Sequence, residues 1–357
     1  MIKKYIIIII IGLILCALAI AFYLNNQKVD YSSYEPFGNK KSYFETYSFP
    51  KINTNIPTIE VSIAAYPFSA KLVEAIADKN AYKDELKHIS TQQSYQDVID
   101  NKVDISISFD TSDEQNNIIE ESEDIVRVPF AKEALVFYTN ANNPVDSLTI
   151  DEINKIYNLE ITNWNILGGK DLEILPFQLE KNVGGSEKCF SKIVSENKSS
   201  KIENLIACDM KNIVDLTSRN EGGIGYAFNQ FYSKLYLKNS LKKLKVNEIE
   251  PTDENIANGS YPLLFNVYYI YRKSNDNENV QKIIDWLLSD EGQNFIAKNG
   301  YCPIKWTKWG HELFVSKLSK LRRKVRVPIW FKLVLSVLHI CFINIVCNVF
   351  NWIEAVF

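Results

Sequence analysis

The sequence has few of the residues on which catalytic and metal sites depend. Its three histidines, His88, His311 and His339, are far apart, and no two of them have the spacing of a metal-binding pair. A nucleophile elbow, a Walker loop and other catalytic motifs are also missing. We therefore expect a protein that is not an enzyme and that uses no metal or cofactor.

A strong net charge is missing as well. Forty Lys and Arg residues against 43 Asp and Glu residues leave a formal charge of −3, so no basic field points to nucleic acid as a partner. What is present is the composition of a folded protein, with 46% hydrophobic and 23% charged residues. The length of 357 residues suffices for two domains of about 100 to 150 residues each.

A hydrophobic segment lies at each end of the chain. Residues 5–24 have no charged side chain, and their length is that of a membrane-spanning helix. We predict that residues 1–24 are an uncleaved anchor in the cell membrane, with the globular part on the extracytoplasmic side. Residues 327–357 contain two charged side chains and predict a second, membrane-associated helix, which either spans the membrane or lies in its interface.

Between these ends, the pattern of hydrophobic residues becomes regular only after a polar and aromatic stretch, residues 25–56, which is typical of a stalk or extended lead-in. Strands and helices then alternate, which favours an α/β fold with a largely parallel sheet. The periodicity predicts strands over 58–65, 103–109, 134–140 and 261–273, and helices over 69–79, 95–101, 149–158 and 279–300.

Several segments occur in a characteristic order between residues 57 and 304: "YPFSAKLVEAIA", "NNPVDSLTIDEINKIYNLEITNWNILGG", "LPFQLEKNVGGSEKCF", "GGIGYAF" and "IIDWLLSDEGQNFIAKNGYCPI". In this order they resemble the PstS-like phosphate-binding protein family of ABC transporters. The second segment, residues 142–169, is the most specific, because many spaced positions agree.

The resemblance implies a type 2 periplasmic-binding-protein fold, in which two α/β lobes are joined by two crossing strands and hold a ligand in the cleft between them. Closure of the lobes would trap that ligand. On this chain, residues 57–131 and 264–317 would form lobe 1, and residues 132–263 would form lobe 2.

The resemblance also places the family's phosphate site on four loops. In the first loop, Ser62 and Ala64 keep the family's residue types. In the second, Thr91 and Tyr95 match positions that face the ligand. In the third, Asp110 falls near the position of an acceptor, which would receive the proton that monohydrogen phosphate has and sulfate lacks.

The fourth loop departs from the family. Leu179 stands where the family has an arginine that clamps the oxyanion, and losing such a clamp costs on the order of 2 to 5 kcal/mol of binding. Gln178 and the backbone amides of Gly184, Gly185 and Ser186 remain as candidate ligand-binding groups. We therefore expect a degenerate site that binds phosphate weakly.

Two functions stay open on this basis. The first is a membrane-tethered extracytoplasmic solute-binding protein that passes inorganic phosphate or another small anion to an ABC permease, with Lys181 partly replacing the missing arginine. The alternative is a binding-protein fold whose ligand site has decayed and which acts as a sensor or envelope interaction module.

Three cysteines, Cys189, Cys208 and Cys302, lie outside the hydrophobic ends. An exported domain could form one disulfide from them. The resemblance places Cys189 and Cys208 in the same lobe, which makes them the better pair, and two reduced cysteines are the alternative.

Overall fold

The computed structural model describes residues 35–38, 49–83, 86–181, 185–194, 196–235 and 238–304. The predicted segments 1–24 and 327–357 lie outside this range, as does most of the predicted stalk. Within the described part, none of the helices is both long enough and apolar enough to cross a membrane.

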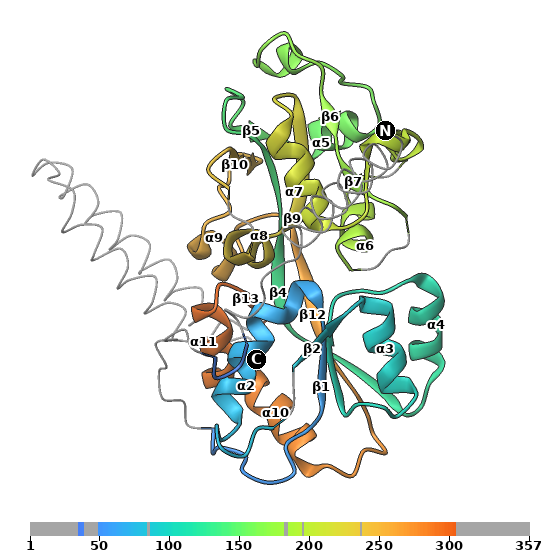
Figure 1. Cartoon of the computed structure of the whole chain (residues 1–357), viewed down its shortest axis with the longest axis vertical. Coiled ribbons are helices and arrows are strands. Elements are labelled where there is room, and N and C mark those ends of the chain that lie inside the picture. The colour runs from blue at the N-terminus through green and yellow to red at the C-terminus, as the bar shows by residue number, and fades with distance from the viewer. Residues whose placement is uncertain are drawn as a thin grey trace, which may run out of the picture. The chain divides into compact units, whose positions relative to one another are not determined.

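Nine strands of the described chain form one mixed sheet that runs through two lobes (Figure 1). Its main path has the order β2-β1-β3-β12-β4-β9-β6, and β10 and β13 also pair with β4. β1 is parallel to β2 and β3, and β12 is antiparallel to β3 and β4. The strands of this sheet are β1 (Ile59–Ser62), β2 (Lys87–Ile89), β3 (Ile105–Ser108), β4 (Ile125–Asn140), β6 (Leu175–Pro176), β9 (Gly223–Phe228), β10 (Leu241–Lys243), β12 (Leu264–Arg272) and β13 (Cys302–Pro303). Two short pairs complete the strands, β5 (Ser147–Leu148) with β11 (Lys245–Val246) and β7 (Gln178–Leu179) with β8 (Ile206–Ala207).

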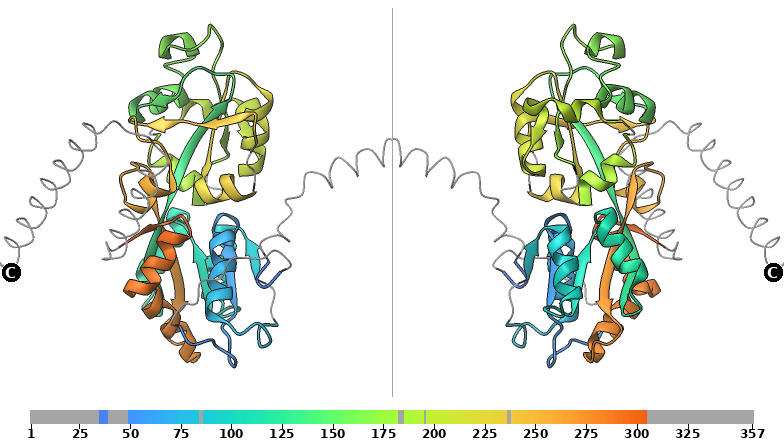
Figure 2. Two further views of the ribbon diagram at one scale, coloured as in Figure 1. Left: turned by 90° about the vertical axis from the view of Figure 1, so that its left-hand side faces the viewer. Right: turned by 90° about the vertical axis from the view of Figure 1, so that its right-hand side faces the viewer.

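β4 is the strand that joins the two lobes. Its first part pairs with β12 of the lower lobe in Figure 1, which corresponds to the predicted lobe 1. Its last part pairs with β9 of the upper lobe, which corresponds to the predicted lobe 2. Figure 2 shows the same two lobes from the sides, with β4 passing from one to the other. The predicted α/β class and two-lobed arrangement are confirmed. The expectation of a largely parallel sheet is wrong, because β4 pairs antiparallel with β9, β10, β12 and β13. Because β4 continues without a break through residues 131 and 132, the lobe boundary placed there stays a prediction.

α5 begins where local signals predict, whereas α2 and α3 begin three and four residues before their predicted starts. Thr149 precedes α5, and its hydroxyl accepts from the Glu152 amide while the Glu152 carboxylate accepts from Thr149, which makes a capping box. α2 begins at Tyr66, three residues before the predicted start, because Pro67 is compatible with a first helical turn. The helices are α2 (Tyr66–Ile76), α3 (Thr91–Ile99), α4 (Asp113–Glu121), α5 (Ile150–Tyr157), α6 (Gly185–Ser191), α7 (Met210–Arg219), α8 (Asn229–Leu235), α9 (Asp253–Ala257), α10 (Glu278–Leu288) and α11 (Asp290–Lys298).

The prediction of one helix over residues 279–300 is wrong. The segment forms two helices, α10 and α11, because Ser289 is extended and its hydroxyl accepts from the Gly292 amide at 3.2 Å to start α11. The predicted end is correct, since Gly300 has a φ of +82°, a conformation that glycine adopts without strain.

The hydrophobic core follows the sheet through both lobes. A smaller cluster lies under α3 and α4 and contains Tyr95, Val98, Val103, Ile119 and Ile270. Trp164 is fully buried, and its indole N–H donates to the Gly222 carbonyl at 2.9 Å.

Candidate functional site

Buried serine hydroxyls lie at the carboxyl ends of β1 and β3. Val61 pairs with Ile107, so Ser62 and Ser108 follow side by side in the parallel pair. Both side chains are buried, and within the described residues neither hydroxyl has a hydrogen-bond partner. Ala64 follows in the short 3-10 helix η2 (Ile63–Ala65) and is also buried. Carboxyl ends of parallel strands are where α/β folds bind ligands, so these hydroxyls are available for a polar ligand.

Two helix starts from different lobes meet beside these strands. α6 lies above α3 in Figure 1, and the Gly185 amide donates to the Thr91 hydroxyl at 3.3 Å. A Cβ atom on residue 185 would lie 3.0 Å from Cβ of Phe109 and 3.1 Å from Oγ1 of Thr91. Glycine is thus the residue that permits this close approach. Ser186 is buried in the same turn, whereas Gly184 lies outside the described residues.

An aromatic contact also joins the lobes next to this point. The rings of Phe109, after β3, and Phe228, at the end of β9, are stacked with centroids 3.9 Å apart and an interplanar angle of 15°. Both side chains are fully buried. The hydroxyl of Tyr95 donates to the Phe109 carbonyl at 2.8 Å, and burial raises the pKa of Tyr95 above its ordinary value. The hydroxyl proton of Tyr95 is therefore committed to the backbone.

Asp110 is held by two cations. Its carboxylate lies 3.7 Å from the Arg127 guanidinium of β4 and forms an ion pair with the Lys192 ammonium group, which follows α6. Partial burial alone lowers the pKa of Lys192, but the hydrogen bond and the charge of Asp110 raise it above the ordinary value. The Arg127 guanidinium also lies 4.8 Å from the centre of the Tyr268 ring. Neither Arg127 nor Lys192 is predicted as a site residue, because nothing in the sequence links them to Asp110.

The fourth loop has no cation at the clamp position. The Leu179 side chain is 6% exposed and belongs to the main core, and its backbone amide donates to the Tyr226 hydroxyl at 3.3 Å. The Gln178 amide group donates to the Ser199 hydroxyl at 2.6 Å, while its carbonyl oxygen has no partner among the described residues. Lys181 is exposed at the end of the described part of this loop.

A buried carboxyl pair lies beneath the serines. Glu60 is on the same face of β1 as Ser62, and its carboxyl group interacts with that of Asp97 in α3. Burial and then the hydrogen bond and charge of Asp97 raise the pKa of Glu60 to about 7. Two lysines also approach this pair, since the Lys102 ammonium group lies 3.0 Å from Asp97 and the Lys87 ammonium group lies 3.9 Å from Glu60.

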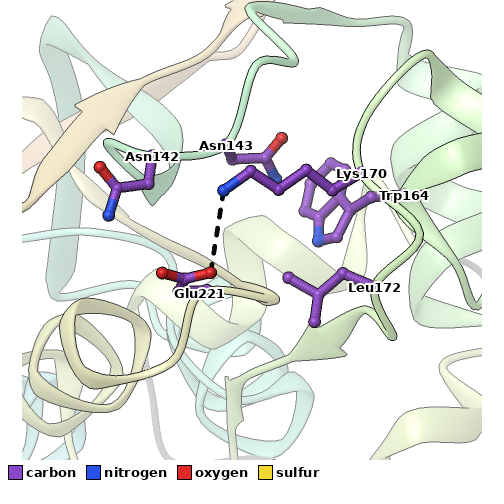
Figure 3. Close-up of a pocket in the computed structure, with 6 residues that line it drawn as sticks. All are labelled: Asn142, Asn143, Trp164, Lys170, Leu172 and Glu221. Carbon is purple, nitrogen blue, oxygen red and sulfur yellow. Dashed lines mark ion pairs between the residues drawn. The ribbon is translucent and has the colours of Figure 1, made fainter.

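The structure contains a separate hollow in the upper lobe (Figure 3). Lys170 and Glu221 form an ion pair across this hollow, with 3.8 Å between Nζ of Lys170 and Oε2 of Glu221. None of the predicted site residues lines this hollow, whose lining is Asn142, Asn143, Trp164, Lys170, Leu172 and Glu221.

The cysteines that the structure describes, Cys189, Cys208 and Cys302, are free thiols. Cys189 and Cys302 are buried, and Cys208 is exposed. The pairing of Cys189 with Cys208 is therefore wrong for this structure. Within the described residues, no group of three or more His, Cys, Asp or Glu side chains could hold a metal ion.

Comparison with known proteins decides the family. A model of the PBP superfamily domain matches residues 52–291, well over half of the chain. The chain belongs to the PBP superfamily. The resemblance to PstS-like phosphate-binding proteins is also confirmed by individual relatives. The phosphate-binding protein PstS of Borreliella burgdorferi is 26% identical over 182 residues, which cover 49% of this chain and 65% of the relative. PstS of Bacillus subtilis is 25% identical over 175 residues, covering 48% of this chain and 56% of the relative.

Solved structures agree with this PBP assignment. A Clostridium perfringens protein assigned as a phosphate ABC transporter substrate-binding protein, with bound phosphate, has a TM-score of 0.58 and 28% identity, covering 69% of this chain and 98% of that one. A Vibrio cholerae ABC-type phosphate transport receptor has a TM-score of 0.51 and 20% identity, covering 69% and 98%, and supports the fold alone. The chain spans less than two thirds of the length of the curated relatives it matches.

Proposed function

We propose that this PBP superfamily protein binds a small oxyanion in the cleft between its lobes and serves an ABC transporter as an extracytoplasmic solute-binding protein tethered to the membrane. The observation that supports this most directly is the meeting of Thr91 and Gly185. The Gly185 amide of one lobe donates to the Thr91 hydroxyl of the other, next to strand ends where the Ser62 and Ser108 hydroxyls have no partner among the described residues. Such donors can surround an anion.

The site is a weak one for phosphate. Neutral donors supply hydrogen bonds, but the clamp position is occupied by the buried side chain of Leu179, and the carboxylate of Asp110 is already paired with two cations. Desolvating an anion without a fixed opposite charge is costly. The same observations favour the second candidate function, a decayed binding site on a sensor or envelope interaction module.

Isothermal titration of the full-length protein in detergent with phosphate, and separately with sulfate, tests the proposal. We expect phosphate binding weaker than about 1 µM, a dissociation constant that corresponds to about −8.2 kcal/mol. Thr91→Val should remove this binding, while Thr217→Val, whose hydroxyl donates only within α7 to the Ile213 carbonyl, should leave it unchanged. Absence of binding by the wild type would exclude the first function and favour the second.

A further inference from the structure

Asp110 is the residue of the candidate site whose surroundings differ most from the predicted role. As a ligand acceptor, its carboxylate would have to face the bound anion with a free oxygen. Instead, one oxygen lies 3.7 Å from the Arg127 guanidinium and the other is paired with the Lys192 ammonium group. The side chains of Asp110 and Arg127 are 15% and 17% exposed, so neither ion is fully solvated.

The two cations reach Asp110 from different parts of the molecule. Arg127 is in the part of β4 that belongs to the lower lobe, and a hydrogen bond to the Asn116 side chain and the Tyr268 ring fix its position. Lys192 directly follows α6 in the upper lobe, and its side chain is 49% exposed. Asp110 therefore pairs with a mostly buried cation of the lower lobe and a half-exposed cation of the upper lobe.

We propose that Asp110 acts as an internal anion of the cleft, occupying Arg127 and Lys192 and competing with oxyanions from solution for these two cations. The two cations and one carboxylate leave a net charge of +1, whereas the cations alone would have +2. This inference rests on the proposed function of the same cleft and identifies the side chain that limits its affinity.

The proposal predicts a gain of function from a conservative substitution. Asp110→Asn keeps the size and a hydrogen-bonding oxygen but removes the negative charge, so both cations become available. We expect affinity for phosphate and for sulfate to rise about tenfold or more, to a similar extent, because the gain is in charge attraction and not in recognition of a proton. Titration of the full-length protein in detergent measures both dissociation constants.

Asp113→Asn is the matched control. Asp113 also pairs with a lysine across the lobes, Lys188, but its side chain is 83% exposed, and removing its charge should leave both affinities unchanged. Lys192→Gln combined with Asp110→Asn should lose most of the gain. Thermal unfolding of each variant confirms that it is folded before its affinities are compared.

The outcomes separate this inference from the proposed function. A gain for both anions supports the inference, whatever the affinity of the wild type. A loss of phosphate binding with unchanged sulfate binding would identify Asp110 as an acceptor for the phosphate proton and overturn the inference while the proposed function stands. Unchanged affinities in Asp110→Asn, or an equal gain in Asp113→Asn, would also overturn it. No binding of either anion by the wild type and by Asp110→Asn would overturn both.

Discussion

Leu179 leaves the cleft without a positive charge at the position of the family's arginine. Its side chain is packed in the core of the upper lobe, where the resemblance implies a guanidinium in related proteins. A leucine there stabilises the lobe by burial but contributes nothing to holding an anion. Compared with an arginine, the leucine therefore stabilises the packing of the lobe and weakens the binding of an anion.

Restoring the family pattern at this position should restore affinity. Leu179→Arg with Val183→Ser is expected to strengthen phosphate binding by about one to three orders of magnitude, because the guanidinium supplies a bidentate charge-assisted contact in a desolvated cleft. Leu179→Met with Val183→Ser is the control, since it keeps the volume and adds no charge. Equal affinities of the two double variants, measured by calorimetry, would mean that the cleft no longer has the inherited shape.

Glu133 gives a second prediction for a single residue. It is fully buried in β4, and its carboxylate accepts from the amides of Ala134 at 3.1 Å and Gln230 at 3.4 Å. Burial raises the pKa of Glu133 to about 8. The folded protein therefore holds a proton that the unfolded chain releases near pH 4.5, and the contribution of Glu133 to stability falls as the pH rises from about 4.5 to 8.

Glu133→Gln removes this dependence while keeping an acceptor oxygen. We expect the variant to be more stable than the wild type at pH 8 to 9 by about 1 kcal/mol or more, and the two to converge towards pH 5. Urea unfolding at several pH values measures this difference. A constant difference across the range would show that the carboxyl group does not titrate as its burial requires.

The sequence predicts the site residues unevenly, for a physical reason. The resemblance assigns Ser62, Thr91 and Gly185 to ligand loops, and in the structure they lie at the end of β1 and at the starts of α3 and α6. Asp110 was expected to accept a proton from a ligand, but its partners are Arg127 and Lys192. Ion pairs between lobes depend on tertiary placement, so a motif that contains only one partner does not indicate them.

At the scale of elements, the start of α5 is a local feature that the sequence alone predicts. Thr149→Ala removes the side chain that caps this helix and should destabilise the protein by about 1 kcal/mol. Thr149→Ser retains the hydroxyl and should have little effect. Thermal unfolding of both variants measures the difference. Equal melting temperatures for the alanine and serine variants would contradict a stabilising capping box.

The break between α10 and α11 is a helix boundary that the spacing of hydrophobic residues does not predict. The helical spacing of hydrophobic residues continues through Ser289, so the pattern predicts one helix. In the structure the chain turns tightly there, and a Cβ atom on Gly292 would lie 2.0 Å from the Trp286 carbonyl oxygen. The turn depends on this close backbone contact, which periodicity does not detect.

At the scale of the molecule, the Phe109–Phe228 stack is a direct contact between the lobes, and we expect it to favour their closed arrangement without a ligand. Phe228→Leu removes the ring pair, which contributes about 0.5 to 1.5 kcal/mol, so the open population should rise about two- to tenfold. Hydrogen exchange of residues 109–113 and 185–191 should become faster by the same factor. Phe295→Leu, within the lower lobe, is the control and should leave these residues unchanged.

The order of strands in the sheet determines which lobe can complete its strand pairing first during translation. β12 lies between β3 and β4 in the sheet, but it is translated after every strand of the upper lobe. Until residue 272 has left the ribosome, β3 and β4 each keep an unpaired edge, which is a site for wrong pairing. The lobe made from the middle of the chain is thus expected to fold first on the nascent chain. Pulse proteolysis of stalled chains that end before β12 and after β13 would detect this order.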